Sequence, residues 1–188
     1  QFLQAIVRIE DRMLPVLYKT GDELSDNQVK ELIDNMWERQ SEYEEEYLSR
    51  SDEQYSEDNF DRLTENLSDY LGALSAEQTD QIGKAVSSLK RFDQAWLDER
   101  KVWFKSLQQI MQRQPGWQQA FSKAYAQRKK NRTAEYHAYL EHNMAIFNLA
   151  IAKVINLRSE KQSQHLKREI DKLRADIQFL IAKSDAAL

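Results

Sequence analysis

The sequence predicts an all-α protein, and three observations carry this prediction. Apolar residues recur at helical spacing along almost the whole chain of 188 residues. Only 4 Gly and 2 Pro are present, so few positions interrupt a helix. A Ser-x-x-Gln pattern with a leucine one or two residues before the serine occurs three times ahead of an amphipathic stretch, at Ser25–Gln28, Ser75–Gln78 and Ser159–Gln162. We therefore expect an elongated bundle of five to six helices.

Each Ser-x-x-Gln pattern has the chemistry of a capping box, which marks the start of a helix. The serine hydroxyl can accept a hydrogen bond from the backbone N–H three residues on. The glutamine side chain can reach back to the serine N–H. Helices are thus predicted to begin directly after Ser25, Ser75 and Ser159.

The first 72 residues are predicted to form three helices. One covers residues 2–18, where Pro15 should kink or end it, and Gly21-Asp22 should turn the chain. The second follows the box at Ser25 and breaks near residues 49–51. The third closes at Gly72, because glycine is the usual residue after a helix C-terminus.

The remaining residues are predicted to form three more helices. The apolar line that starts at the Ser75 box continues to Ile110. Arg100 lies on that line, so its head group should reach solvent or find a partner. Gln114-Pro115-Gly116 is the clearest break in the chain. Beyond it, one very long helix is predicted over residues 117–155, roughly 55–60 Å at ~1.5 Å per residue.

The last predicted helix starts at the Ser159 box and should lie antiparallel to the long one. Its apolar residues are close to heptad spacing. They are Leu166, Ile170, Leu173, Ile177 and Leu180. We expect a single elongated domain over residues 1–188, with a possible division into 1–113 and 117–188. The helical pattern is already present at Gln1, so a leader and a first helix are expected to precede it. Trp117 is expected to be the most exposed tryptophan.

The net charge of −4 conceals an uneven distribution of charge. Residues 1–80 hold 7 Lys/Arg against 21 Asp/Glu, whereas residues 81–188 hold 20 against 10. We favour packing of acidic helices beside basic ones; the alternative is a basic surface for an acidic or unfolded partner. A possible basic binding strip consists of Arg128, Lys129, Lys130 and Arg132.

The basic strip has several interpretations. The simplest is the solvated outer face of a helix. Anionic lipid headgroups or cell-wall polymer are possible ligands. Nucleic acid is disfavoured, because the whole chain is acidic and no groove-reading motif is present.

No residue pattern points to a reaction. Cys is 0, which excludes disulfides, thiol catalysis and cysteine-bound zinc. His137 and Glu141 have the i,i+4 spacing of metal ligands, but no second pair accompanies them, so no metal or cofactor is predicted. No Gly-rich phosphate loop, nucleophile elbow or apolar run of 18 residues occurs. We expect a non-catalytic binding protein; an enzyme with an unrecognised site is the further alternative.

Several motifs resemble an uncharacterised family of proteobacterial lipoproteins. The matching features are a helix that ends in Leu-Gly, a Leu-Ser-x-x-Gln box, and a Leu-x-x-Arg segment leading to Trp. The residues in those positions are Leu71, Gly72, Leu74, Arg100 and Trp103. The resemblance implies a helical periplasmic protein of unknown activity, lipid-anchored to the outer membrane of a Gram-negative bacterium. Its partner would be a protein or a cell-envelope component. The family's leader and lipid-bearing cysteine are not among residues 1–188, so the anchor is inferred.

The repeated box is also similar to that of Spy/CpxP-type periplasmic chaperones. Those proteins carry Leu-Thr-x-x-Gln at helix starts, whereas this chain has Ser in place of Thr and an extra Arg158 in the third box. The similarity implies a holdase for unfolded proteins as an alternative function.

Overall fold

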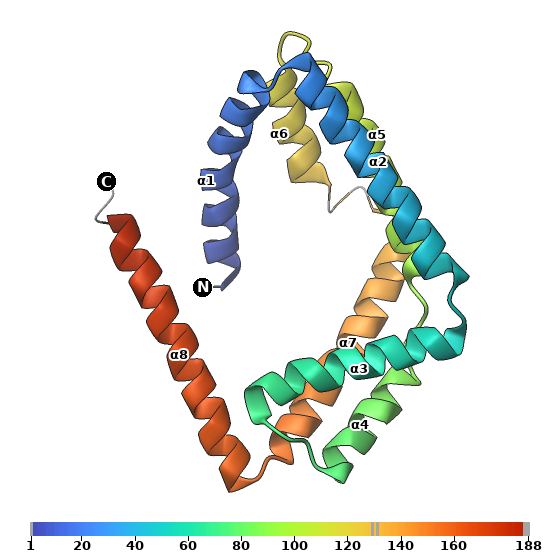
Figure 1. Ribbon diagram of the computed structural model, residues 1–188, viewed down its shortest axis with the longest axis vertical. Helices are drawn as coiled ribbons and strands as arrows, with labels where there is room; N and C mark the ends of the chain where they lie inside the picture. The colour runs from blue at the N-terminus through green and yellow to red at the C-terminus, as the bar shows by residue number, and fades with distance from the viewer. Residues whose placement is uncertain (1, 129, 131, 186–188) are drawn as a thin grey trace. The chain divides into compact units, whose positions relative to one another are not determined.

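The computed structural model describes residues 2–128, 130 and 132–185, with side chains described between residues 12 and 180 of those ranges. Every regular element in this part of the chain is an α-helix and none is a strand, so the all-α prediction is confirmed. Figure 1 shows the helices in chain order. They are α1 (Phe2–Glu23), α2 (Asp26–Ser49), α3 (Asp52–Leu71), α4 (Ala76–Val86), α5 (Asp93–Ile110), α6 (Trp117–Gln127), α7 (Ala134–Asn156) and α8 (Glu160–Asp185).

The chain divides into two compact units that interleave along the sequence. Unit 1 comprises residues 1–50 and 92–138, and unit 2 comprises residues 51–91 and 139–188. The possible division between residues 113 and 117 lies inside unit 1. The reason is that the turn at Pro115-Gly116 joins α5 and α6, which pack against each other inside unit 1. A backbone break in the sequence thus need not separate compact units.

The very long helix predicted over residues 117–155 is wrong, because α6 ends at Gln127 and α7 begins at Ala134. Thr133 starts α7. Its hydroxyl accepts a hydrogen bond from the backbone N–H of Tyr136 at 3.1 Å, and its own N–H donates to Oε1 of Glu99 at 2.8 Å. A threonine cap and a carboxylate from α5 therefore interrupt the helix without any Gly or Pro.

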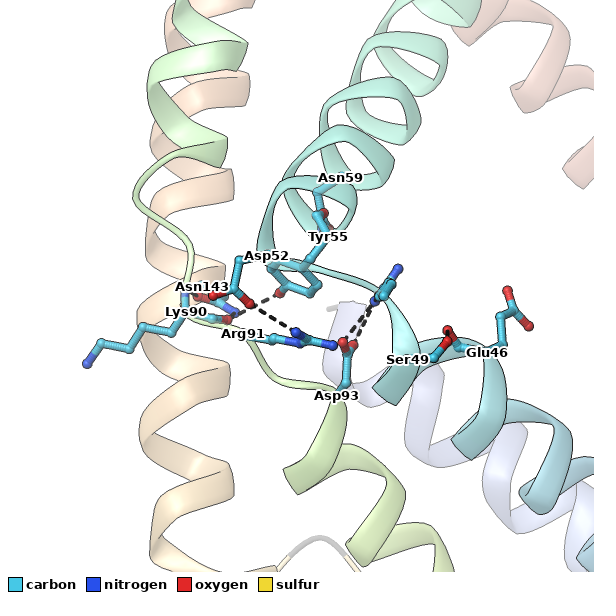
Figure 2. Close-up of polar contacts among 10 residues, drawn as sticks. Glu46, Ser49, Asp52, Tyr55, Asn59, Lys90, Arg91, Asp93 and Asn143 are labelled. Atoms are coloured by element: carbon cyan, nitrogen blue, oxygen red, sulfur yellow. Dashed lines mark hydrogen bonds and ion pairs between the residues drawn. The ribbon is translucent and has the colours of Figure 1, made fainter.

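The helix predicted from the Ser75 box to Ile110 is also two helices. After α4 ends, the segment before α5 is held by side chains that are distant in sequence. The backbone N–H of Lys90 donates to Oδ1 of Asn143 at 2.9 Å. The Lys90 carbonyl accepts from Nδ2 of Asn143 at 2.8 Å and from the hydroxyl of Tyr55 at 3.2 Å (Figure 2). These hydrogen bonds take the place of the backbone hydrogen bonds that a continuous helix would make. The described part consequently has eight helices rather than five to six.

Near the start of the chain, α1 continues through both Pro15 and Gly21, where a break and a turn were expected. Gly21 is buried, and a Cβ atom at this position would overlap the ring of Trp117. The glycine therefore permits a close approach rather than a turn. Trp117 is 8 % exposed, contrary to expectation, and its Nε1 donates to the carboxylate of Asp22 at 3.2 Å.

Four capping boxes start helices in the described residues. Both hydrogen bonds of the box are present at Ser25, Ser75 and Ser159. The fourth, Ser51 with Gln54, starts α3 and was overlooked because no leucine precedes it. Gly72 ends α3 with a φ of 74°, a conformation that favours glycine, and its N–H donates to the Ser68 carbonyl at 2.7 Å.

Each unit has its own apolar core. In unit 1 the core lies among α2, α5 and α6 and consists of Val29, Ile33, Met111, Trp117 and Phe121. In unit 2 it lies among α3, α4 and α7 and consists of Leu63, Leu67, Leu71, Ile82, Val86 and Val154. The polar faces of these helices therefore remain available for ion pairs.

Ion pairs join the acidic and basic parts of the sequence within each unit. In unit 1, Arg50 at the end of α2 binds Asp93 at the start of α5 at 2.7 Å, and Figure 2 shows the two dashed contacts that reach Asp93. Lys101 pairs with Glu44 at 2.9 Å, and Arg113 with Asp26. In unit 2, Arg91 pairs with Asp52 at 2.9 Å. These pairs favour the interpretation in which acidic and basic helices pack together.

Candidate binding pocket

One pocket of unit 1 lies beside α5, where α6, the α6–α7 connection and the start of α7 approach it. Its volume is about 440 Å³, within the usual range for ligand pockets. Aromatic and arginine side chains dominate its lining. The residues are Trp96, Glu99, Arg100, Val102, Trp103, Phe104, Ser106, Ala124, Arg128, Arg132 and Tyr136.

Arg100 is surrounded by aromatic rings. Its guanidinium carbon lies 4.8 Å from the ring centre of Trp96, 4.9 Å from that of Phe104 and 5.0 Å from that of Tyr43. Trp96 and Phe104 are one helical turn before and after Arg100 on α5, so the local sequence builds two sides of this cage. The guanidinium is therefore fixed in direction by stacking and cation–π attraction.

A buried amide also holds Arg100 in place. Nε of Arg100 donates to Oε1 of Gln40 at 3.0 Å, and Gln40 is only 2 % exposed. The Gln40 amide donates in turn to Oε1 of Glu44 at 2.6 Å and to the carbonyl of Leu97 at 3.2 Å. This bond from Gln40 lowers the pKa of Glu44 below its usual value, and Lys101 acts in the same direction. Polar groups of α2 and α5 thus form one satisfied network behind the pocket.

Two arginines of the predicted basic strip line the same pocket. The guanidinium of Arg128 lies 3.5 Å from the ring centre of Tyr125, and that of Arg132 lies 4.6 Å from that of Tyr136. Tyr136 is buried against Phe92, with ring centres 4.8 Å apart. Both guanidiniums are therefore positioned by rings that the fold itself fixes.

Of the two lysines of the predicted strip, only Lys130 is among the described residues. Lys130 is exposed and is not among the lining residues, and Lys129 lies outside the described residues. The strip was proposed as one face of a continuous helix. α6 ends before the strip, and both of its arginines line the pocket.

The pocket combines positive charge with apolar walls. Among the described residues that line it, three are arginines and one, Glu99, is acidic; the Glu99 carboxylate accepts the Thr133 N–H. A guanidinium has five N–H donors in a planar fork that matches carboxylate and phosphate oxygens. This arrangement can bind an anionic group that is attached to an apolar or aromatic body. Across the described residues no group of three or more His, Asp or Glu side chains is placed to hold a metal ion.

A second site of interest is a corner of unit 2 where two capping boxes meet. Gln78 and Gln162, each the third residue of its helix, exchange two amide hydrogen bonds of 3.2 and 2.9 Å. Nε2 of Gln78 also donates to the Val154 carbonyl at 3.0 Å, and Nε2 of Gln162 to the Ala73 carbonyl at 2.9 Å. The side-chain oxygen of Gln78 also accepts from the Ser75 N–H, and that of Gln162 from the Ser159 N–H. Each of the two buried amides therefore uses all of its donors and acceptors.

The five residues of the family motif therefore belong to two places. Leu71, Gly72 and Leu74 lie around the glutamine pair, beside a smaller cavity of about 280 Å³. Arg100 and Trp103 lie in the pocket of unit 1. Sequence analysis missed Trp96, Phe104 and Tyr136 as pocket residues. The spacing of four residues from Trp96 to Arg100 and from Arg100 to Phe104 was the available signal.

Comparison with known proteins gives one match. The model of a family of unknown function, DUF6279, matches residues 1–137. No curated protein and no solved structure matches the chain. A search of the described helices for a membrane-spanning segment found none that is sufficiently long and apolar.

Proposed function

We propose a function for this chain from its own pocket, because the chain belongs to DUF6279, a family whose function is unknown. The proposed function is non-catalytic binding of a protein or cell-envelope component that presents an anionic group. The observation that carries it is the convergence of Arg100, Arg128 and Arg132 on one aromatic-lined pocket. Such a pocket supplies charge-assisted hydrogen bonds for an anion and apolar area for the group that bears it.

The fixed geometry of the arginines supports binding. Arg100 is held by Gln40 and three rings, and Arg132 lies over the ring of Tyr136. Less side-chain entropy is lost on binding when the donors are already ordered. The pocket therefore has the preorganisation expected of a binding site rather than of a mobile charged surface.

The proposal is tested with a charge-removal variant of the pocket. Arg128→Gln/Arg132→Gln removes two pocket charges without changing the core. Detergent-solubilised envelope extract is passed over immobilised wild-type and variant protein, and bound proteins and lipids are identified by mass spectrometry. We expect at least one component to bind wild type, to dissociate at high salt, and to be lost from the variant.

Lys105→Gln/Lys123→Gln is the matched control. It also removes two positive charges, from α5 and α6 beside the pocket, at exposed positions that do not line it. The component should still bind this variant. Identical sets of bound components for wild type and both variants would refute the proposal.

We further propose that the protein works in the periplasm, held to the outer membrane by a lipid. The support is the resemblance of the Leu71-Gly72 and Arg100–Trp103 motifs to a lipoprotein family. Fractionation of Gram-negative cells that express the full-length protein, with palmitate labelling, tests both parts. Recovery in the cytosol without label would contradict them.

A holdase of the Spy/CpxP type is the second candidate function. Exposed apolar side chains favour it, among them Val16, Val102 and Leu149, each more than half exposed. The purified protein should then delay aggregation of several unrelated unfolded clients at a stoichiometric ratio. Protection of none of them would exclude this function, whereas the pocket variant would leave protection unchanged.

A further inference from the structure

The C-terminal half of α8 carries an apolar stripe that is exposed to solvent. Every residue from 170 to 180 is exposed, and Figure 1 shows α8 extending past α3, α4 and α7 of its own unit. The stripe consists of Ile170, Leu173, Ile177 and Leu180, whose exposed fractions range from 44 to 62 %. Large apolar side chains aligned in this way form a docking surface.

The spacing and residue types of the stripe specify a kind of partner. The intervals of three, four and three residues place Ile170 and Ile177 at position a of a heptad and Leu173 and Leu180 at position d. In a parallel coiled coil, isoleucine at a with leucine at d favours two helices over three or four. Leu166, the preceding d position, already packs against the core of unit 2, so the available seam begins at Ile170.

The charges beside the stripe specify its orientation. The two g positions are acidic, Glu169 and Asp176, and the two e positions are basic, Lys167 and Arg174. In a parallel pair of identical helices, g of one copy lies beside e of the next heptad in the other copy, so Glu169 faces the oppositely charged Arg174 of the second copy. An antiparallel pair would bring g beside g and e beside e, which joins like charges.

The charged residues beside the stripe can change ion-pair partners at little cost in stability. Within one chain, Lys172 binds Glu169 at 2.7 Å, and Arg174 lies 3.6 Å from Asp171. The side chains of Lys172, Arg174 and Asp171 are more than half exposed, whereas that of Glu169 is 23 % exposed; ion pairs with an exposed partner contribute little to stability. Contacts between copies can therefore form in their place.

We infer that a second copy of this chain docks on α8, in a parallel two-stranded coiled coil through Ile170, Leu173, Ile177 and Leu180. The stripe is self-complementary in both shape and charge, as a symmetric dimer requires. This inference is independent of the proposed binding function, because the pocket residues belong to unit 1 and α8 belongs to unit 2.

Sedimentation velocity of the whole chain over a wide concentration range tests the dimer. Wild type should change from one to two copies of the 22.2 kDa chain as concentration rises. Leu173→Ser/Ile177→Ser should weaken dimerisation at least about tenfold, since each copy loses two large apolar side chains from the seam. Both positions are exposed in the single chain, and circular dichroism verifies that the helices persist.

Phe179→Ser is the matched control. Phe179 is the most exposed large apolar residue of this segment, at 66 %, but it occupies position c on the opposite side of the helix. It should leave dimerisation unchanged. A wild type that stays monomeric at all concentrations, or an equal loss in the control, would overturn the inference.

The absence of cysteine from the chain permits a direct test of orientation. Ile170→Cys and Leu180→Cys should each form a disulfide-linked dimer on mild oxidation, because a parallel arrangement places identical positions together. Cross-linking only in a mixture of the two variants would indicate an antiparallel pair and contradict the inference. Arg174→Glu should weaken the dimer, and Glu169→Arg/Arg174→Glu should restore it by reversing both charges.

Discussion

Gln78 and Gln162 show how one residue type can act both locally and over a long distance. Each caps its own helix, and together they form a buried amide pair that joins the starts of α4 and α8. Gln162→Glu removes the donors to the Ala73 carbonyl and to Gln78, so we expect it to destabilise the protein by about 1–3 kcal/mol. Urea denaturation measures the change.

The same substitution at an exposed box isolates the effect of the pair. Gln28 takes part only in the box at Ser25, and glutamate serves equally well as the third residue of a capping box. Gln28→Glu should therefore change the free energy of unfolding by less than about 0.5 kcal/mol. Equal losses at the two positions would contradict a special role for the buried pair.

Gly21 offers a second test at a single position. Although alanine is the better helix former by about 1 kcal/mol, the added methyl group would overlap Trp117. We expect Gly21→Ala to destabilise unit 1 by about 1–3 kcal/mol, the usual cost of overpacking. Gly83 is also helical, but a Cβ there would lie 3.9 Å from Phe60, an ordinary contact. Gly83→Ala should be neutral or stabilising. Thermal denaturation of both variants measures the difference.

Among whole helices, their starts were more predictable than their ends. The starts at Ser25, Ser75 and Ser159 were readable because a capping box lies entirely within four consecutive residues. The ends of α4 and α6 were not, because the bonds from Asn143 to Lys90 and from Thr133 to Glu99 join residues far apart in sequence. Apolar periodicity continues through both breaks and conceals them.

The pocket was predictable only in part, for the same reason. Arg100 was recognised as a polar residue on an apolar line, and Arg128 and Arg132 as members of a basic strip. Their convergence depends on the break between α6 and α7, which no local pattern indicates. The supporting residues Gln40 and Tyr136 come from helices that sequence analysis could not place beside α5.

The connection between α4 and α5 can be tested by removing its clamp. Asn143→Ala leaves the N–H of Lys90 without its partner and removes one donor to the Lys90 carbonyl. We expect a loss of about 1–3 kcal/mol in the free energy of unfolding. Hydrogen exchange should also become faster in residues 87–92. Asn148 lies on the same helix but is exposed, so Asn148→Ala should change neither quantity measurably.

For the whole chain, the uneven charge distribution makes stability dependent on carboxylates. Three ion pairs each join a residue from 1–80 to an oppositely charged residue from 81–188 within one unit. They are Arg50–Asp93, Lys101–Glu44 and Arg91–Asp52. Acidification protonates the carboxylates and leaves the cations without opposite charge. Tertiary packing in both units should therefore weaken at low pH.

Glu44 gives this dependence a measurable sign. Its pKa is lowered in the folded protein, first by the hydrogen bond from Gln40 and then by Lys101. A lowered pKa contributes stability that is fully present above the unfolded value of 4.5 and is lost as pH falls through the folded value. We expect the wild-type Tm to fall below pH 4.5, and to fall less steeply in Glu44→Gln, which has no proton to gain. Glu45 is an exposed neighbour for which no ion pair with a described side chain is found, so Glu45→Gln should keep the wild-type pH dependence. Equal slopes of Tm against pH for all three proteins would show that the α2–α5 network does not set acid stability.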